Sequence, residues 1–164
     1  MRLPLIKKFD AEVADVVTTA TTITDEYTAE LDKCMIEVKE LLAKDTDIPG
    51  PTLNYYIATL PILIYELSNR VMELGIKSDA AKMQRKQVYN ETYLNTENGT
   101  VAKKTGIAQQ ACQNEQFVED IFSRVYKNCE NKIEVATMLH GSLKKVQSWQ
   151  VAQIDLTKNT NLFR

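Results

Sequence analysis

The chain has 164 residues, of which 44% are hydrophobic and 26% are charged, and its 20 basic and 22 acidic side chains give a net charge of −2. This length fits one domain, and the apolar fraction excludes a wholly disordered chain. The near-neutral balance also excludes a histone-like binder of nucleic acid, although it is compatible with a local basic patch.

The cysteine and histidine content limits which disulfides and metal sites the chain is expected to form. Cys34, Cys112 and Cys129 are far apart and form no C-x-x-C pair, and His140 is the single histidine. A disulfide framework or zinc cluster is therefore not expected, and a reducing cytoplasmic compartment fits better. The most apolar stretch, residues 55–65, is about half as long as a membrane span. No apolar run of the kind found in secretory signals follows the charged first residues, so we expect no membrane partner.

The first predicted helix covers residues 25–43, with Thr24 or Asp25 as its cap. Its apolar residues recur at steps of three and four, which makes one stripe on a helix. The preceding residues 13–24 are rich in β-branched side chains, a composition that favours a strand, but their spacing also fits a helix. Because no second strand is evident, we predict a helix there as well. Residues 45–51 contain two prolines and should form a loop.

The middle of the chain is predicted to hold two helices separated at Gly75. The first opens near Pro51 and runs to Leu74, and it is apolar on most of its circumference, so we expect it to be largely buried and kinked at Pro61. Gly75 is predicted to act as a left-handed cap.

Beyond Gly75, Ser78 is predicted to cap a helix over residues 79–94. A loop at residues 95–100 follows, because Asn-Gly is a turn signal. Thr100 is predicted to cap a short basic helix over residues 101–111.

The last predicted helix is the longest and carries a heptad pattern between Val118 and Gln150. One interpretation is a coiled-coil seam through which copies of the chain assemble, and the other is a long core helix within one bundle. Lys132 and Gln150 interrupt the pattern. The predicted oligomer interface comprises Val118, Phe122, Val125, Cys129, Ala136, Leu139, Leu143 and Val146.

These elements predict an all-α protein: an elongated helical bundle with a long, coiled-coil-like C-terminal helix. We expect a single helical domain over residues 1–164. Its parts are an acidic N-terminal helical part (1–51), a helical core with the assembly helix (52–156) and a polar tail (157–164).

Charge is unevenly distributed along the chain. Residues 9–51 contain eleven acids and three bases, whereas residues 77–110 carry a net charge of +3. Lys82, Arg85 and Lys86 lie at i, i+3 and i+4 and hence on one side of a helix. Cations neutralise phosphates and aromatic rings stack on bases, as binding of single-stranded nucleic acid requires. The candidate contacts are Lys82, Arg85, Lys86, Tyr89, Tyr93, Lys103 and Lys104. The alternative is that this cluster is only the solvated side of a helix. Assembly into an oligomer would raise the affinity of such a patch through multivalency.

The order of features between residues 82 and 150 resembles that of phage UvsY-like recombination mediators. The shared features are the basic and tyrosine-containing helix, the loop at Asn98-Gly99-Thr100, the basic connector 101–111 and the long helix that ends near Trp149. The resemblance implies a homo-oligomer that binds single-stranded DNA and cooperates with a recombinase or a single-strand-binding protein. It also implies that the candidate lysines and arginine contact phosphates and that the tyrosines stack on bases. The acidic first 75 residues have no counterpart in it.

No constellation of residues predicts catalysis, a metal site or a cofactor. His140 has no carboxylate partner at a suitable spacing, and phosphate-binding loops and nucleophile motifs are absent from the sequence. Trp149 suits either a partner-binding anchor or the core. We therefore expect a non-catalytic, single-stranded DNA-binding oligomer of a phage, located in the cytoplasm of the infected cell. The alternative is a phage factor without DNA affinity whose acidic N-terminal part binds a host nuclease or defence complex, and a virion component is a third candidate.

Overall fold

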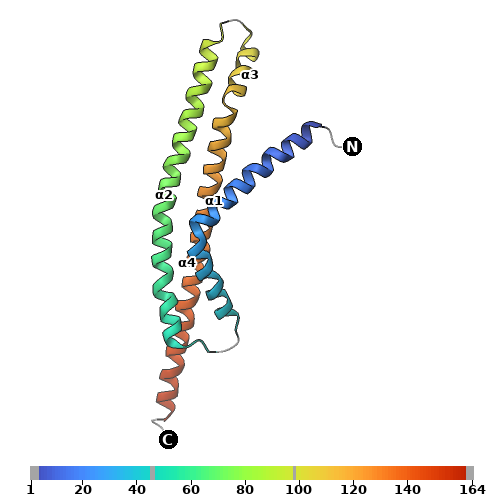
Figure 1. Cartoon of the computed structure of the whole chain (residues 1–164). Helices are drawn as coiled ribbons and strands as arrows, with labels where there is room; N and C mark the ends of the chain where they lie inside the picture. The colour runs from blue at the N-terminus through green and yellow to red at the C-terminus, as the bar shows by residue number, and fades with distance from the viewer. Residues whose placement is uncertain (1–3, 45–46, 98, 162–164) are drawn as a thin grey trace. The chain divides into compact units, whose positions relative to one another are not determined.

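The computed structural model describes the backbone of residues 4–44, 47–97 and 99–161, and the side chains of residues 13–44, 47–97 and 99–157. These residues form four helices and no strand, which confirms the all-α prediction. The helices, shown in Figure 1, are α1 (Pro4–Ala43), α2 (Gly50–Asn95), α3 (Val101–Ala111) and α4 (Gln113–Asn161). Among the described helices, none combines the length and the apolar content that crossing a membrane requires.

The threonine-rich part of α1 is helical, as predicted, because its hydroxyl groups find partners within the helix. Thr22 Oγ1 donates to the Thr18 carbonyl at 3.0 Å, and Thr24 Oγ1 donates to the Ala20 carbonyl at 2.7 Å. Such bonds to the carbonyl four residues back satisfy a threonine hydroxyl in a helix. The predicted cap at Thr24 or Asp25 is wrong, since α1 continues through both positions and Thr24 is buried.

The predicted break after Leu74 is also wrong, because α2 continues without interruption to Asn95. Gly75 does not have a positive φ angle and caps nothing. A Cβ atom at Gly75 would lie 3.4 Å from Cε2 of Tyr126 on α4, which is ordinary van der Waals contact, so Gly75 lies beside this ring. Ser78 is therefore an interior helical residue, and Pro61 lies inside α2 without ending it.

The short helix α3 has the predicted bounds. The Thr100 side chain accepts a hydrogen bond from the Lys103 amide at 3.4 Å, which confirms the predicted cap. The Cys112 amide donates to the Ala108 carbonyl at 3.2 Å at the other end, and α4 follows directly. α4 continues to Asn161, so the predicted tail is helical at 157–161, and residues 162–164 lie outside the described part. Asp45 and Thr46 of the predicted loop also lie outside it.

The helices contribute to two compact units, a division that the prediction of one domain did not include. Unit 1 comprises Met1–Tyr27 and Asn69–Cys129, and unit 2 comprises Thr28–Ser68 and Glu130–Arg164. The described core of unit 1 includes Ala20, Leu74, Ala108 and Val125, one from each helix. The described core of unit 2 includes Val38, Leu53, Leu60, Ala136 and Leu143, drawn from α1, α2 and α4.

Candidate nucleic-acid interface

The candidate DNA-contacting residues of α2 lie in unit 1 along one side of the helix. Lys82, Lys86, Tyr89 and Tyr93 follow each other at steps of four, three and four, which keeps them on one side of a helix. Both lysines are exposed, whereas both tyrosines are half-buried. The two rings are nearly parallel, with centroids 6.2 Å apart and an angle of 13° between their planes. We call these four residues the cationic stripe.

Arg85, which was predicted to contact phosphate, differs from the members of this stripe because it pairs with a carboxylate of the chain. Its Nε atom lies 2.6 Å from Oε2 of Glu119 on α4, and both atoms are buried. The geometry is that of a close ion pair rather than an aligned hydrogen bond. Arg85 lies four residues after the buried Ala81 and therefore on the side of α2 that packs against α4. Arg85 therefore joins α2 to α4 through its Nε atom, and Glu119 balances its charge.

Two further candidate lysines lie on α3, in the same unit. Lys103 is exposed and Lys104 is half-buried. The aliphatic part of Lys103 runs back over Gly99, because a Cβ atom built there would lie 3.2 Å from Lys103 Cδ. Lys82, Lys86, Lys103 and Lys104 make no ion pair with any carboxylate of the described residues. No described carboxylate therefore competes with a ligand for these four ammonium groups.

The predicted oligomer interface on α4 is largely internal to the chain, which corrects that prediction. Val125, Cys129, Ala136 and Leu143 are each 0% exposed. Phe122, Leu139 and Val146 are half-buried, and only Val118 is exposed, at 41%. The heptad pattern of α4 is therefore covered by the chain's own helices, as in the alternative interpretation of a core helix. A second copy cannot reach the four fully buried side chains while this fold persists.

The polar interruptions of that pattern have partners within unit 2. Lys132 Nζ lies 2.5 Å from Oδ2 of Asp32 and donates to Thr28 Oγ1 at 2.7 Å. Thr28 Oγ1 in turn donates to the same Asp32 oxygen at 2.6 Å. Lys132 therefore joins α4 to α1. A partly buried cation is stabilised only when charged or polar groups face it, and Asp32 and Thr28 do so here.

Gln150, the other interruption, closes the opposite end of unit 2. Its Nε2 atom donates to the carbonyl of Ile48, in the segment that leads into α2, at 2.9 Å. Nearby, Gln147 Nε2 donates to Asn54 Oδ1 at 2.6 Å. Gln150 of the α4 pattern is thus hydrogen-bonded to this chain's own backbone, and the neighbouring Gln147 is hydrogen-bonded to its Asn54 side chain.

The remaining reactive side chains are three cysteines and one histidine. Cys34, Cys112 and Cys129 are free and buried. Burial, followed by the nearby Glu37 carboxylate, raises the pKa of the Cys34 thiol, so this sulfur stays protonated and a poor nucleophile. His140 is half-buried on α4. The part of the chain that the structure describes contains no group of three or more His, Cys, Asp or Glu side chains arranged to hold a metal ion.

One surface feature was missed by the sequence analysis. The helix predicted to be largely buried has an exposed apolar side, on which Tyr55, Ile62 and Tyr65 are 59%, 58% and 68% exposed. The signal was present in the sequence as a second set of apolar residues at steps of three, four and seven. This distribution predicted a largely buried helix, whereas one side of α2 is covered and Tyr55, Ile62 and Tyr65 on the other side are exposed.

Comparison of the chain with protein-family models, curated proteins and solved structures finds no match.

Proposed function

We propose that this chain binds single-stranded DNA without catalysing a reaction and acts as a mediator of recombination or replication for a phage. The observation that supports the proposal is the cationic stripe of unit 1, in which two exposed lysines continue into two parallel tyrosine rings. Lysine ammonium groups neutralise phosphates and release counterions, and aromatic faces stack on unpaired bases. Lys103 and Lys104 extend the positive charge to α3. In this proposal a recombinase or single-strand-binding protein is the protein partner, and the location is the host cytoplasm.

The test is binding of a fluorescent single-stranded oligonucleotide at several salt concentrations. The affinity should fall steeply with salt, and the double variant Lys82→Ala, Lys86→Ala should bind roughly tenfold more weakly. The slope of log affinity against log salt should become shallower by about 1.4, since each phosphate contact to a single strand contributes about 0.7.

A matched control for this variant is available on α4. Lys144 and Lys145 are also exposed, and neither makes an ion pair with a described carboxylate. The double variant Lys144→Ala, Lys145→Ala removes the same charge from unit 2 and should leave the slope unchanged. Equal losses in the two double variants would show that only net charge matters and would contradict a defined binding stripe.

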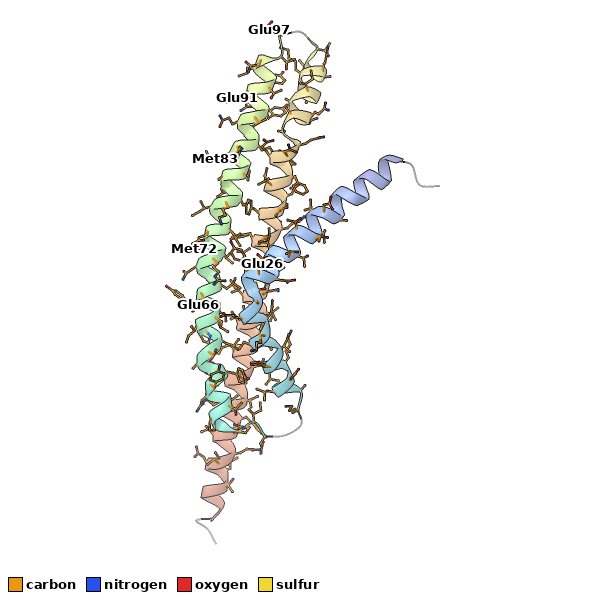
Figure 2. All side chains as sticks on the ribbon, in the orientation of Figure 1. Glu26, Glu66, Met72, Met83, Glu91 and Glu97 are labelled. Carbon is orange, nitrogen blue, oxygen red and sulfur yellow. The ribbon has the colours of Figure 1, made fainter. Side chains whose placement is uncertain are left out.

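A second candidate function is supported by the acidic surface of α1. Glu26, Glu30 and Glu40 are exposed, and Figure 2 labels Glu26 on this helix. In this proposal the chain binds a basic surface of a host nuclease or defence complex and has no affinity for DNA. Absence of oligonucleotide binding even at low salt would favour this function over the first.

A further inference from the structure

The C-terminal end of α4, in unit 2, exposes several large apolar side chains. Trp149, Val151, Ile154 and Leu156 are 56%, 54%, 53% and 67% exposed. The helix nevertheless continues through them to Asn161. Helices in proteins owe most of their stability to the packing of an apolar side, so exposed apolar residues at this end indicate a surface for a partner helix.

One side of this helical end carries a continuous pattern. Lys145, Trp149, Ala152 and Leu156 follow at steps of four, three and four, and all four are exposed. Such a spacing keeps side chains facing a single partner helix. We call these four residues the tryptophan stripe. Val151 lies outside the stripe, because two residues turn a helix by about 200°.

We propose that a second copy of this chain docks on the tryptophan stripe, with the two ends of α4 antiparallel. One register of this pair places Trp149 of each copy opposite Ala152 of the other. A large ring opposite a methyl group lets two helices interdigitate at a short distance. The same register places Leu156 opposite the aliphatic part of Lys145 from the other copy, which covers the leucine and leaves the ammonium group in water.

The charges of this helical end favour the antiparallel orientation. Asp155 flanks the stripe on the edge toward which Lys145 leans, and the twofold axis of an antiparallel pair brings equal edges together. Because Lys145 lies opposite Leu156, it is offset by only about 1.5 Å along the helix axis from Asp155 of the other copy. Both residues are exposed, and neither makes an ion pair with another described residue. Each dimer therefore gains two contacts between opposite charges.

A parallel pair in register lacks these contacts. It places Lys145 beside Lys145 of the other copy and Trp149 beside Trp149. Like charges then meet, which is unfavourable, and two large rings occupy one layer. The composition of the stripe therefore selects the antiparallel pair.

A hollow of about 240 Å³ lies at the other edge of the stripe, next to Trp149. Its lining includes Leu41 and Leu42 of α1, Ile48 before α2 and Val146 of α4. In the antiparallel register, Gln153 of the second copy lies close to Val146 and hence at the hollow. The hollow therefore leaves room for the second helix beside the end of α1, and its apolar lining adds to the area that the dimer buries.

The size of the contact predicts a weak dimer. From Lys145 to Leu156 the stripe is about 17 Å long. A tryptophan is a typical anchor of an interface, but a contact of this length is small among specific interfaces, so we expect dimers at roughly tens of micromolar. At the lower concentrations of oligonucleotide binding the chain should be monomeric. The dimer therefore does not depend on the proposed function, and Lys145 remains a control for it.

Sedimentation velocity of the full chain between about 1 and 200 µM tests the proposal without DNA. The wild-type chain should form a dimer at the upper end of this range. Trp149→Ala removes the ring and Ala152→Glu fills the place opposite it, so each should weaken dimerisation at least tenfold. Val151→Glu is the matched control, because it changes the same helical end outside the stripe and should leave the dimer intact. Circular dichroism should show the same helix content in every variant, since all three positions are exposed.

A charge exchange tests the orientation. Lys145→Asp or Asp155→Lys alone brings like charges together and should weaken dimerisation at least threefold, whereas the double variant should recover most of this loss. The proposal would be overturned by a wild-type chain that stays monomeric at 200 µM, or by equal losses in Val151→Glu and Trp149→Ala. A double exchange that dimerises no better than the single exchanges would overturn the antiparallel pairing and the proposal with it.

Discussion

The apolar pattern of α4 and the second set of apolar residues on α2 have similar spacing, but the chain covers only the first. On α4, the chain's own helices cover Val125 and Leu143 completely, while on α2 the side chains of Ile62 and Met72 remain more than half exposed. The polar residues of the α4 pattern also have partners within the chain, because Lys132 meets Thr28 on α1 and Gln150 meets the Ile48 carbonyl in the segment before α2. A heptad spacing by itself therefore does not tell whether a set of apolar side chains is covered, whereas the partners of the polar residues within it do.

The largest expected difference separates a buried and an exposed apolar residue of unit 2. Leu143→Asp places a carboxylate where no part of the side chain is exposed, and it should lower the free energy of unfolding by about 4 kcal/mol or more. Ile62→Asp should change it by about 0.5 kcal/mol or less, because that side chain is solvated. Chemical denaturation measures both. Similar effects of the two changes would contradict the contrast between a covered and an uncovered apolar side chain.

A smaller effect is expected at the polar cluster of α4 and α1. Lys132→Met removes the cation that faces Asp32 and Thr28, and it should destabilise the chain by about 1.5 kcal/mol, less than a fully buried pair because both side chains are partly exposed. Changing Asp32 to Asn in the same chain should recover part of this loss. Lys132→Met leaves the Asp32 carboxylate without a counter-ion, whereas the asparagine amide carries no charge. Denaturation of the two single variants and the double variant gives the coupling energy, and additive losses would contradict the assigned pairing.

The two cations Arg85 and Lys82, one helical turn apart, should behave differently. Arg85→Leu should lower the free energy of unfolding by about 1 kcal/mol, because Glu119 loses its ion-pair partner in a partly buried place. Lys82→Leu should leave stability nearly unchanged but make the salt dependence of DNA binding shallower by about 0.7. Denaturation and oligonucleotide binding together separate the two roles. An exchange of these effects between the residues would contradict the assignment of Arg85 to the packing of α2 on α4.

The smallest expected effect concerns pH. The Tyr56 hydroxyl donates to Glu37 Oε2 at 3.0 Å, and burial followed by this hydrogen bond raises the pKa of Tyr56 above its ordinary value of 10.0. A group whose pKa is higher in the folded than in the unfolded chain stabilises the fold fully below the unfolded pKa and loses this contribution as pH rises through the folded one.

Tyr56→Phe should therefore lower stability by about 0.5 kcal/mol at pH 8 and make the decline above pH 10 less steep. Denaturation midpoints between pH 8 and 11 test this. A decline of equal steepness in the variant would show that the Tyr56 hydroxyl is not the group responsible.

Much of the fold was predictable from local sequence signals. The errors occurred where contacts between distant parts of the chain determine a helix end or the partner of a side chain. The cap at Thr100 and the bounds of α3 depend on neighbouring residues, and the sequence predicts them correctly. Gly75 carries a strong stop signal in the sequence, but α2 continues through it, and it lies beside the Tyr126 ring, which is far along the chain. The position of Arg85 within the basic cluster likewise depends on Glu119 of another helix.

The candidate site shows the same limit. Residue spacing predicts that Lys82, Lys86, Tyr89 and Tyr93 share one side of α2. Which of two apolar patterns is covered, however, depends on how three helices pack, and no pattern within α4 or α2 alone contains that information.

Oligonucleotide binding by two double variants tests the central claim most directly, namely that a defined stripe on α2 contacts single-stranded DNA. Lys82→Ala, Lys86→Ala should make the slope of log affinity against log salt shallower by about 1.4. Lys144→Ala, Lys145→Ala removes the same charge from exposed positions of α4 and should leave the slope unchanged. Equal slopes in the two variants would contradict the account.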